Sequence, residues 1–218
     1  MIEEGRVKLD GQVVLKAARQ MDPAQAIVVA ESDEADYVSR GAHKLAGVLD
    51  ALGDRAPRIR GRRALDAGAS TGGFTDVLLR RGAASVVAVD VGYGQLAWKL
   101  QADPRVEVHD RTNVRTLDPA AVAPAPDLVV GDMSFISLTL VLPALVAAAA
   151  PDADFLLMVK PQFEIGKERL GRGGVVRNPE HHVETVEKVA RCAIDLGLDI
   201  AAVAASPLPG PSGNVEYF

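Results

Sequence analysis

A lysine and an aspartate that follow apolar runs are well placed for acid–base chemistry in this sequence of 218 residues. Lys160 closes the run Phe155–Val159, and Asp132 follows the run Leu128–Val130. Burying a lysine charge is costly, so a lysine at the end of an apolar strand is unusual. Partial burial and a second nearby cation would favour its neutral amine, which could then remove a proton from a hydroxyl group. The alternative is a lysine whose ammonium group reaches solvent at the strand end.

A glycine-rich loop follows the earlier apolar run Ala64–Ala67. It reads Asp-Ala-Gly-Ala-Ser-Thr-Gly-Gly-Phe and leads directly into a helical pattern. A dinucleotide site would need Gly-x-Gly-x-x-Gly, whereas Asp-x-Gly-x-x-x-Gly-Gly is typical of methyltransferases that use S-adenosylmethionine. The alternative is a tight turn that binds nothing. The cofactor-binding residues expected in this loop are Asp66, Gly68, Ser70, Thr71, Gly72, Gly73 and Phe74.

Two further carboxylates follow the next two apolar runs. Asp90 comes after Ser85–Val89, where a carboxylate can accept both ribose hydroxyls of an adenosyl group. Asp110 comes after Val106–His109, where a carboxylate can accept the adenine amine. Each could instead be a solvated loop acid, but three acids at successive strand ends favour a cofactor site. We include the following residues, Val91 and Arg111, in that site.

Short apolar strands alternate with helices from Arg62 onward, which predicts an α/β fold with a doubly wound parallel sheet. Ser39 is expected to cap a helix that ends near Leu52, before Gly53. Later helices are expected to begin near Thr71, Gln95, Pro119, Ile136 and Pro179. The expected strands are Ala64–Ala67, Ser85–Val89, Val106–His109, Leu128–Val130, Phe155–Val159 and Ile200–Ala204, with an antiparallel last strand at Asn214–Phe218.

The N-terminal residues show a different pattern. Alternating apolar residues flank Asp10-Gly11 within residues 6–14, which predicts a hairpin, and Ala26–Val29 reads as a third strand. The acidic stretch that follows is typical of a linker. We therefore expect a small β appendage at residues 1–30, a linker at 31–38 and the main domain at 39–218.

Composition limits the possible functions. The net charge of −5 means that any contact with RNA must come from a local basic patch. Candidates are the arginines of residues 55–63 and a lid at residues 164–177, although either could be plain solvated surface. The single cysteine, Cys192, excludes a disulfide within the chain and a zinc cluster, which fits the cytoplasm. No apolar run approaches the ~20 residues of a membrane span, and we expect no metal site.

These motifs resemble the TlyA family of the FtsJ-type RNA methyltransferases. TlyA proteins methylate cytidine 2′-hydroxyls in the rRNA of the small and large ribosomal subunits, and some are called hemolysins. The resemblance implies a Rossmann-like class I fold, S-adenosylmethionine as cofactor and ribosomal RNA as partner. The stretches that carry it are Tyr37–Leu45, Asp66–Phe74, Asp90–Leu96, Asp132–Ser137, Val159–Phe163 and Ser206–Phe218.

The resemblance also implies a catalytic tetrad of two lysines and two carboxylates. By matching motif, these are Lys44, Asp132, Lys160 and Glu216. Lys160 would be the base, Asp132 would hold lysine geometry close to the methyl group, and Lys44 and Glu216 would orient the 2′-hydroxyl. Lys44 and Glu216 rest on the resemblance alone, because without it both read as surface charges.

The resemblance extends to the N-terminus, where the hairpin is similar to the end of an S-four-like RNA-binding module. The helical start of that module is missing, so we expect the chain to be a piece of a longer protein. Two other functions stay open. A nucleobase N-methyltransferase usually carries a Pro-Pro-aromatic run after the fourth-strand acid, which Met133-Ser134 does not match. A ribosome-binding or hemolysin-like protein with a vestigial cofactor site would not need intact acids and Lys160.

Overall fold

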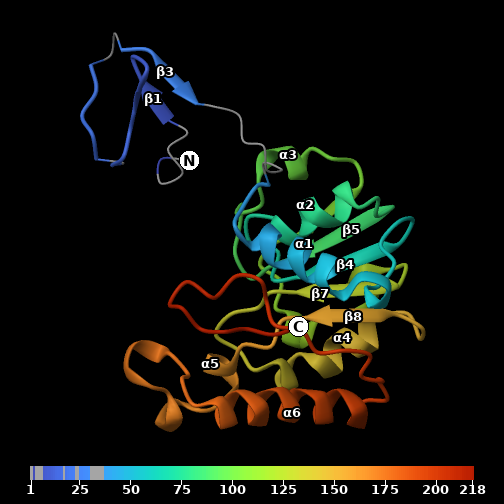
Figure 1. Ribbon diagram of the computed structural model, residues 1–218. Coiled ribbons are helices and arrows are strands. Elements are labelled where there is room, and N and C mark those ends of the chain that lie inside the picture. Colours follow the sequence, from blue (N-terminus) through green and yellow to red (C-terminus); the bar gives the residue numbers. More distant parts are fainter. Residues whose placement is uncertain (1, 3–6, 17, 23–24, 30–36) are drawn as a thin grey trace. The chain divides into compact units, whose positions relative to one another are not determined.

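The computed structural model describes residues 2, 7–16, 18–22, 25–29 and 37–218 (Figure 1). The chain divides into two compact units, residues 1–36 and residues 37–218, and each has its own sheet. Residues 31–36 of the expected linker, and Arg6 of the expected hairpin, lie outside the described residues.

The first unit is a three-stranded antiparallel sheet of order β2-β1-β3. The strands are β1 (Val7–Leu9), β2 (Gln12–Val13) and β3 (Ile27–Val29). The predicted hairpin is confirmed, because Asp10 and Gly11 both have positive φ values, 46° and 82°, as a two-residue turn of this type requires. The assignment of this sheet to an S-four-like module stays a prediction.

The second unit is built on a five-stranded parallel sheet of order β6-β5-β4-β7-β8. The chain runs outward from β4 in one direction and then continues from β7 in the other, so the carboxyl ends of β4 and β7 flank the switch point where such sheets bind ligands. The predicted doubly wound sheet is therefore confirmed. The strands are β4 (Arg63–Ala67), β5 (Ser85–Val89), β6 (Val106–His109), β7 (Leu128–Gly131) and β8 (Asp154–Leu157).

The C-terminal residues pair with this sheet more briefly than expected. Tyr217 forms isolated antiparallel bridges with Val159 on one side and Ala205 on the other. The prediction of a full strand at Ile200–Ala204 is wrong, because pairing with residues 216–218 is confined to residues 204–206. The pairing does not continue beyond Ser206, because prolines follow at 207, 209 and 211 and a proline has no backbone N–H with which to extend a ladder.

Helices cover both faces of the sheet. The helices α1 (Gly41–Leu52) and α2 (Gly73–Arg80) share one cluster of buried residues, together with Leu100 of α3 (Trp98–Gln101). The other face is covered by α4 (Leu142–Ala148) and α6 (Pro179–Asp195), which share a second cluster. Figure 1 shows α6 as the long orange-red helix along the bottom of the view, below α4. The short helix α5 (Pro161–Glu164) follows β8 directly.

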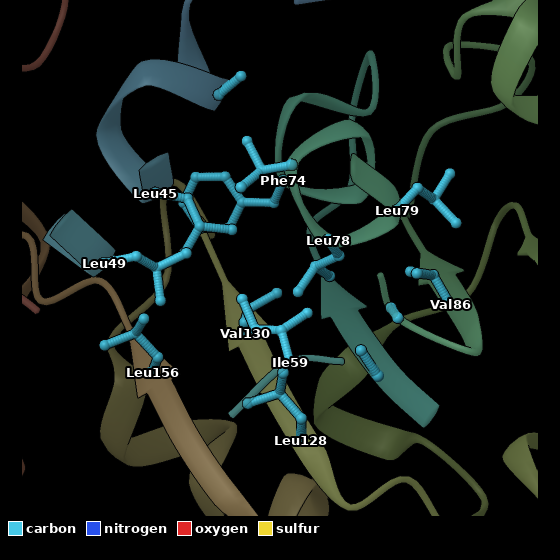
Figure 2. Packing of buried hydrophobic residues seen from close by; sticks show 14 of the residues in the cluster. Leu45, Leu49, Ile59, Phe74, Leu78, Leu79, Val86, Leu128, Val130 and Leu156 are labelled. Carbon is cyan, nitrogen blue, oxygen red and sulfur yellow. The ribbon is translucent and has the colours of Figure 1, made fainter. Parts of the chain in front are cut away.

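Alternation along the strands separates the two clusters. Ala64 of β4 packs toward α1 and α2, whereas Leu65 and Ala67 pack toward α4, as the two-residue period of a strand dictates. Figure 2 shows Leu45, Leu49 and Phe74 converging on the first face of the sheet. Such burial contributes roughly 1.5–3 kcal/mol for each large apolar side chain.

Several predicted helices differ in their bounds. The first begins after Arg40, without a side-chain cap, so the assignment of Ser39 as its cap is wrong. The helix expected near Gln95 is a single turn that begins at Trp98. Short 3-10 turns replace the starts expected near Pro119 and Ile136, at Pro119–Val122 and Leu138–Leu140, while others lie at Gly53–Arg55, Val114–Thr116, Lys167–Arg169 and Arg172–Gly174.

Candidate active site

The structure brings the four residues of the implied tetrad together in one connected group. Lys44 Nζ donates to Glu216 Oε2 at 2.6 Å and lies 4.0 Å from Asp132 Oδ2. The other oxygen of the same carboxylate, Asp132 Oδ1, lies 2.5 Å from Lys160 Nζ. The order in space is therefore Glu216, Lys44, Asp132, Lys160, with carboxyl and amine groups alternating.

Adjacent strands place Asp132 and Lys160. Asp132 follows β7 and Lys160 follows β8, and these neighbouring parallel strands end at the same edge of the sheet. Pro161 then begins α5, so the chain turns away immediately after the lysine. Lys160 Nζ also donates to Ser134 Oγ at 2.9 Å. We did not predict a role for Ser134, although it stands only two residues after Asp132.

Lys44 reaches the group because it lies on the buried face of α1. It is one turn before Val48, and it is buried together with Leu45. The close approach of α1 to α2 depends on Gly73, where a Cβ atom would lie 2.8 Å from the backbone nitrogen of Ala42. Gly73 therefore sets the distance between α1 and the glycine loop that α2 follows.

Glu216 is the most buried member, with only 1% of its side chain exposed. Gln162 Nε2 donates to Glu216 Oε1 at 2.9 Å, so both carboxylate oxygens have a partner. The backbone of the next residue, Tyr217, pairs with Val159 and holds the C-terminal segment beside Lys160. Gln162 is a second residue of the site that we did not single out from the sequence.

The carboxylates after β5 and β6 organise the loops of the predicted cofactor site. Asp90 Oδ2 accepts from the Ser70 backbone N–H at 2.8 Å, and Asp90 Oδ1 accepts from the Gly92 N–H at 2.7 Å. Asp110 Oδ2 accepts from the Gly94 N–H at 2.8 Å. These contacts fix the loops at the carboxyl edge of the sheet. Val91 and Arg111 lie exposed on the same loops.

The glycines of the first loop have packing roles beside any ligand contact. A Cβ atom on Gly72 would lie 2.2 Å from Leu100 Cδ1, and its φ of 96° is unfavourable for other residues. Gly68 has a φ of 83° and lies against the backbone of Asp132. The spacing read from the sequence therefore reflects close packing of α2 with its neighbours as well as an open loop.

A cleft of about 340 Å³ lies between the glycine loop and the two lysines. A volume of this size suits a ligand no larger than a nucleoside derivative. Of the predicted site residues, eight line the cleft: Lys44, Gly68, Ser70, Thr71, Gly73, Phe74, Asp132 and Lys160. Its other lining residues, which we had not predicted, are Ser39, Arg40, Gly41, Ala69, Ser134, Pro209 and Pro211.

Asp66 lies behind the loop rather than in the cleft wall. It is fully buried, and Thr75 Oγ1 donates to its Oδ2 at 2.7 Å. Among the described residues, no hydrogen-bond partner reaches Asp66 Oδ1. Burial raises the pKa of Asp66 to about 7, and the hydrogen bonds from Thr75 only partly oppose this shift.

The stability of the Asp66→Asn variant relative to the wild type is expected to increase as pH rises. The raised pKa stabilises the wild-type fold below about pH 4, and that stabilisation is lost as pH rises toward 7. The asparagine variant has no such proton to lose. We therefore expect the difference in unfolding free energy, Asp66→Asn minus wild type, to shift by a few kcal/mol in favour of the variant between pH 4.5 and pH 8, as measured by urea unfolding. A difference that is the same at both pH values would contradict the burial argument.

The basic residues proposed for RNA contact divide between two uses. Arg62 pairs with Asp154, and Arg63 Nη2 lies 2.8 Å from Glu107 Oε2, so both fasten strands of the sheet. Arg169, in the expected lid, makes two hydrogen bonds of 2.6 and 2.7 Å to Glu184 on α6. The exposed arginines at 55, 58 and 60 stay candidates for phosphate contact.

Within the part of the chain that the structure describes, no group of three or more His, Cys, Asp or Glu side chains could hold a metal ion. None of the helices in that same part is both long and apolar enough to cross a bilayer.

A parallel sheet of this order, with a glycine loop after its first strand and acids at the next strand ends, defines the Rossmann-like fold of S-adenosylmethionine-dependent methyltransferases. The chain belongs to the FtsJ-like methyltransferase family, whose model matches residues 37–218. The resemblance stated from the motifs is thereby confirmed.

Named relatives agree with this assignment. The chain is 57% identical over its whole length to the 16S/23S rRNA (cytidine-2′-O)-methyltransferase TlyA of Mycobacterium tuberculosis, of which it covers 80%. It is 32% identical, again over its whole length, to Hemolysin A of Brachyspira hyodysenteriae, of which it covers 89%. A solved structure described as "Putative hemolysin from Streptococcus thermophilus" superposes with a TM-score of 0.84 at 36% identity, covering 99% of this chain and 78% of that one.

Proposed function

We propose that the protein transfers a methyl group from S-adenosylmethionine to the ribose 2′-hydroxyl of a cytidine in 16S or 23S rRNA. The observation that carries the proposal is the contact between Lys160 Nζ and Asp132 Oδ1 at the edge of a cleft lined by the glycine loop. The relative from Mycobacterium tuberculosis, which is named for this reaction, supports the choice of substrate.

The residues present fit S-adenosylmethionine. Asp90, whose carboxylate is oriented by the N–H groups of Ser70 and Gly92, would accept the ribose hydroxyls. Asp132 puts a carboxylate in the cleft wall, where a positively charged sulfur would be stabilised. The bound cofactor would supply a methyl group activated by that sulfur. Asp66 Oδ1, for which the described residues supply no hydrogen-bond partner, would accept from a water behind the loop.

Lys160 acts as the general base in this proposal. Its neutral amine would take the proton of the 2′-hydroxyl, so that this oxygen could bond to the methyl carbon while the methyl–sulfur bond breaks and its electron pair stays on the sulfur of S-adenosylhomocysteine. Asp132 and Ser134, at 2.5 and 2.9 Å from Nζ, then stabilise the ammonium group that results. Lys44, paired with Glu216, orients the hydroxyl from the other side of Asp132.

A hydrolysis assay tests the proposed product. Methylation of a ribose 2′-oxygen removes the nucleophile of alkaline RNA cleavage, so the next phosphodiester bond resists base. Purified protein, labelled S-adenosylmethionine and ribosomal subunits should therefore give an alkali-resistant dinucleotide that contains cytidine. Label in alkali-sensitive mononucleotides would indicate a nucleobase methyltransferase instead. A protein that neither transfers label nor releases heat when titrated with the cofactor would support the non-enzyme alternative.

Replacing Asp90 with alanine is expected to weaken S-adenosylmethionine binding. The variant loses a charged acceptor for two hydroxyls, and the Ser70 and Gly92 N–H groups lose their partner. We expect the dissociation constant from calorimetry to rise by about 10- to 100-fold. Asp152→Ala is the matched control, because Asp152 is exposed in the turn before β8, at the opposite edge of the sheet. Equal affinities in the two variants would refute the role of Asp90.

The domain boundaries, partner and location complete the proposal. We assign residues 1–30 to the end of an S-four-like RNA-binding module and residues 39–218 to the catalytic domain. Of the expected linker at 31–38, Tyr37 and Val38 pack with the catalytic unit. A cytoplasmic protein that meets ribosomal RNA through local basic patches fits the net charge of −5.

A further inference from the structure

Glu164 is a buried carboxylate for which the proposed reaction has no use. It is the last residue of α5, four positions after Lys160, and only 1% of its side chain is exposed. Its Oε1 accepts from the Leu138 backbone N–H at 2.6 Å, and its Oε2 accepts from Ser137 Oγ at 2.5 Å. Lys188 on α6 donates to Oε2 at 3.1 Å and to the Glu164 carbonyl oxygen at 3.0 Å.

The loop held by Glu164 is the one that carries Asp132. Lys160 contacts Asp132 and Ser134 near the start of this loop, and Glu164 contacts its end. Residues 132–138 and 160–164 are therefore fastened to each other at both ends. The two segments follow the neighbouring strands β7 and β8. The distance between Asp132 and Lys160 depends on how these segments are held together.

The backbone between the two attachment points is strained. Phe135 has a φ of 64°, which is unfavourable for a bulky residue, and its ring is 90% exposed. The ring contacts that of Phe163 on α5, with the ring centroids 5.1 Å apart, but most of the Phe135 side chain stays exposed. Strain of this kind persists only where the surrounding structure enforces it. The fixed ends at Asp132 and at Ser137–Leu138 provide that enforcement.

We propose that Glu164 is a positioning residue that sets the geometry of Asp132 against Lys160. A carboxylate suits this position because it can accept hydrogen bonds from a backbone amide, a hydroxyl and an ammonium group at once. This inference rests on the proposed function, in which Lys160 removes the substrate proton. Without Glu164, the loop loses its second attachment and Asp132 moves relative to the amine.

The test compares Glu164→Ala with two variants that remove one partner each. Displacing a reacting group by about 1 Å can cost on the order of 100-fold in rate, so we expect Glu164→Ala to lower kcat by about 10- to 100-fold. The KM for ribosomal subunits and the dissociation constant of S-adenosylmethionine should change little. Ser137→Ala removes the same contact from the loop side and should lower kcat by a smaller factor.

Lys188→Met is the matched control. It removes the ion pair with α6 but leaves the contacts of Glu164 with Ser137 and Leu138 in place. We expect nearly wild-type kcat from this variant, even if its melting temperature falls. A loss of kcat in Lys188→Met as large as that in Glu164→Ala would overturn the proposal, because Glu164 would then act only through the packing of α5 on α6.

A second readout does not depend on turnover. The Leu138 amide donates directly to Glu164, so its hydrogen exchange should be faster in Glu164→Ala and unchanged in Lys188→Met. If Glu164→Ala does not fold, Glu164→Gln replaces it, with a smaller expected loss of kcat because its amide oxygen can still accept from Leu138. Unchanged exchange and unchanged kcat in either folded variant would overturn the inference. Failure of the proposed function would look different, because the wild-type protein itself would then give no alkali-resistant product.

Discussion

Lys160→Ala is expected to lower kcat for methyl transfer by about 10²–10⁴-fold, the usual contribution of a general base. The amine is the group nearest to Asp132 in the cleft wall, and the variant leaves the 2′-hydroxyl without an acceptor for its proton. The dissociation constant of S-adenosylmethionine should change little, because Asp90 and the glycine loop stay intact. Single-turnover methylation of ribosomal subunits measures the first effect, and calorimetry measures the second.

Lys160→Arg separates the charge of the lysine from its basicity. Arginine keeps a positive charge beside Asp132 but does not lose its proton in proteins, so it cannot serve as the base. We expect this variant to be nearly as slow as Lys160→Ala. Near-normal turnover in either variant would remove Lys160 as the base and leave the cleft without an assigned proton acceptor.

Asp132 and Lys160 could be predicted from the sequence because both follow apolar strands. Parallel strands bring their carboxyl ends to one edge, so Asp132 and Lys160 were expected near each other even before the order of the strands was known. The same rule placed Asp90 and Asp110 at the cofactor loops. It did not reveal that Asp66 would be enclosed behind its loop, since burial depends on the packing of α2 and Thr75.

The other two residues of the tetrad could not be derived in this way. Lys44 and Glu216 are 172 positions apart, and no periodic pattern connects them. A signal for Lys44 was present, because it stands one turn before Val48 on the apolar face of α1 and is therefore a lysine among core positions. Glu216 gave no such signal, since its segment pairs only briefly, with Val159 and with residues 204–206.

The elements that the sequence misplaced are short ones whose form depends on tertiary contacts. The strand expected at Ile200–Ala204 has the right composition, but its partner segment pairs only at residues 216–218. The turn at Leu138–Leu140 starts where Ser137 and Glu164 supply the hydrogen bonds, a contact between segments 26 or 27 positions apart. Propensity within one segment cannot locate such starts.

The buried pair of Lys44 and Glu216 should show its largest effect on stability. Glu216→Ala leaves the Lys44 ammonium buried, with Met158 Sδ at 3.7 Å and Asp132 at 4.0 Å as its remaining neighbours. Removing one partner of a buried ion pair typically costs about 3–5 kcal/mol, so we expect a fall of that size in the unfolding free energy from urea titration. Asp50→Ala is the control: Asp50 is on α1, like Lys44, and the variant breaks only its exposed pair with Arg81 at the end of α2, which should cost about 1 kcal/mol or less.

The double variant Lys44→Met/Glu216→Gln separates stability from chemistry at this pair. Both charges are then absent, and the glutamine can still accept from Gln162, so most of the lost stability should return. Methyl transfer should not return, because the Lys44 ammonium group that orients the 2′-hydroxyl beside Asp132 is gone, and a loss in kcat of about 100-fold is expected. A double variant that regains both stability and turnover would mean that Lys44 and Glu216 hold α1 against the C-terminal segment and do nothing to the substrate. The activity of a stable, uncharged pair therefore decides whether the buried charges belong to the reaction.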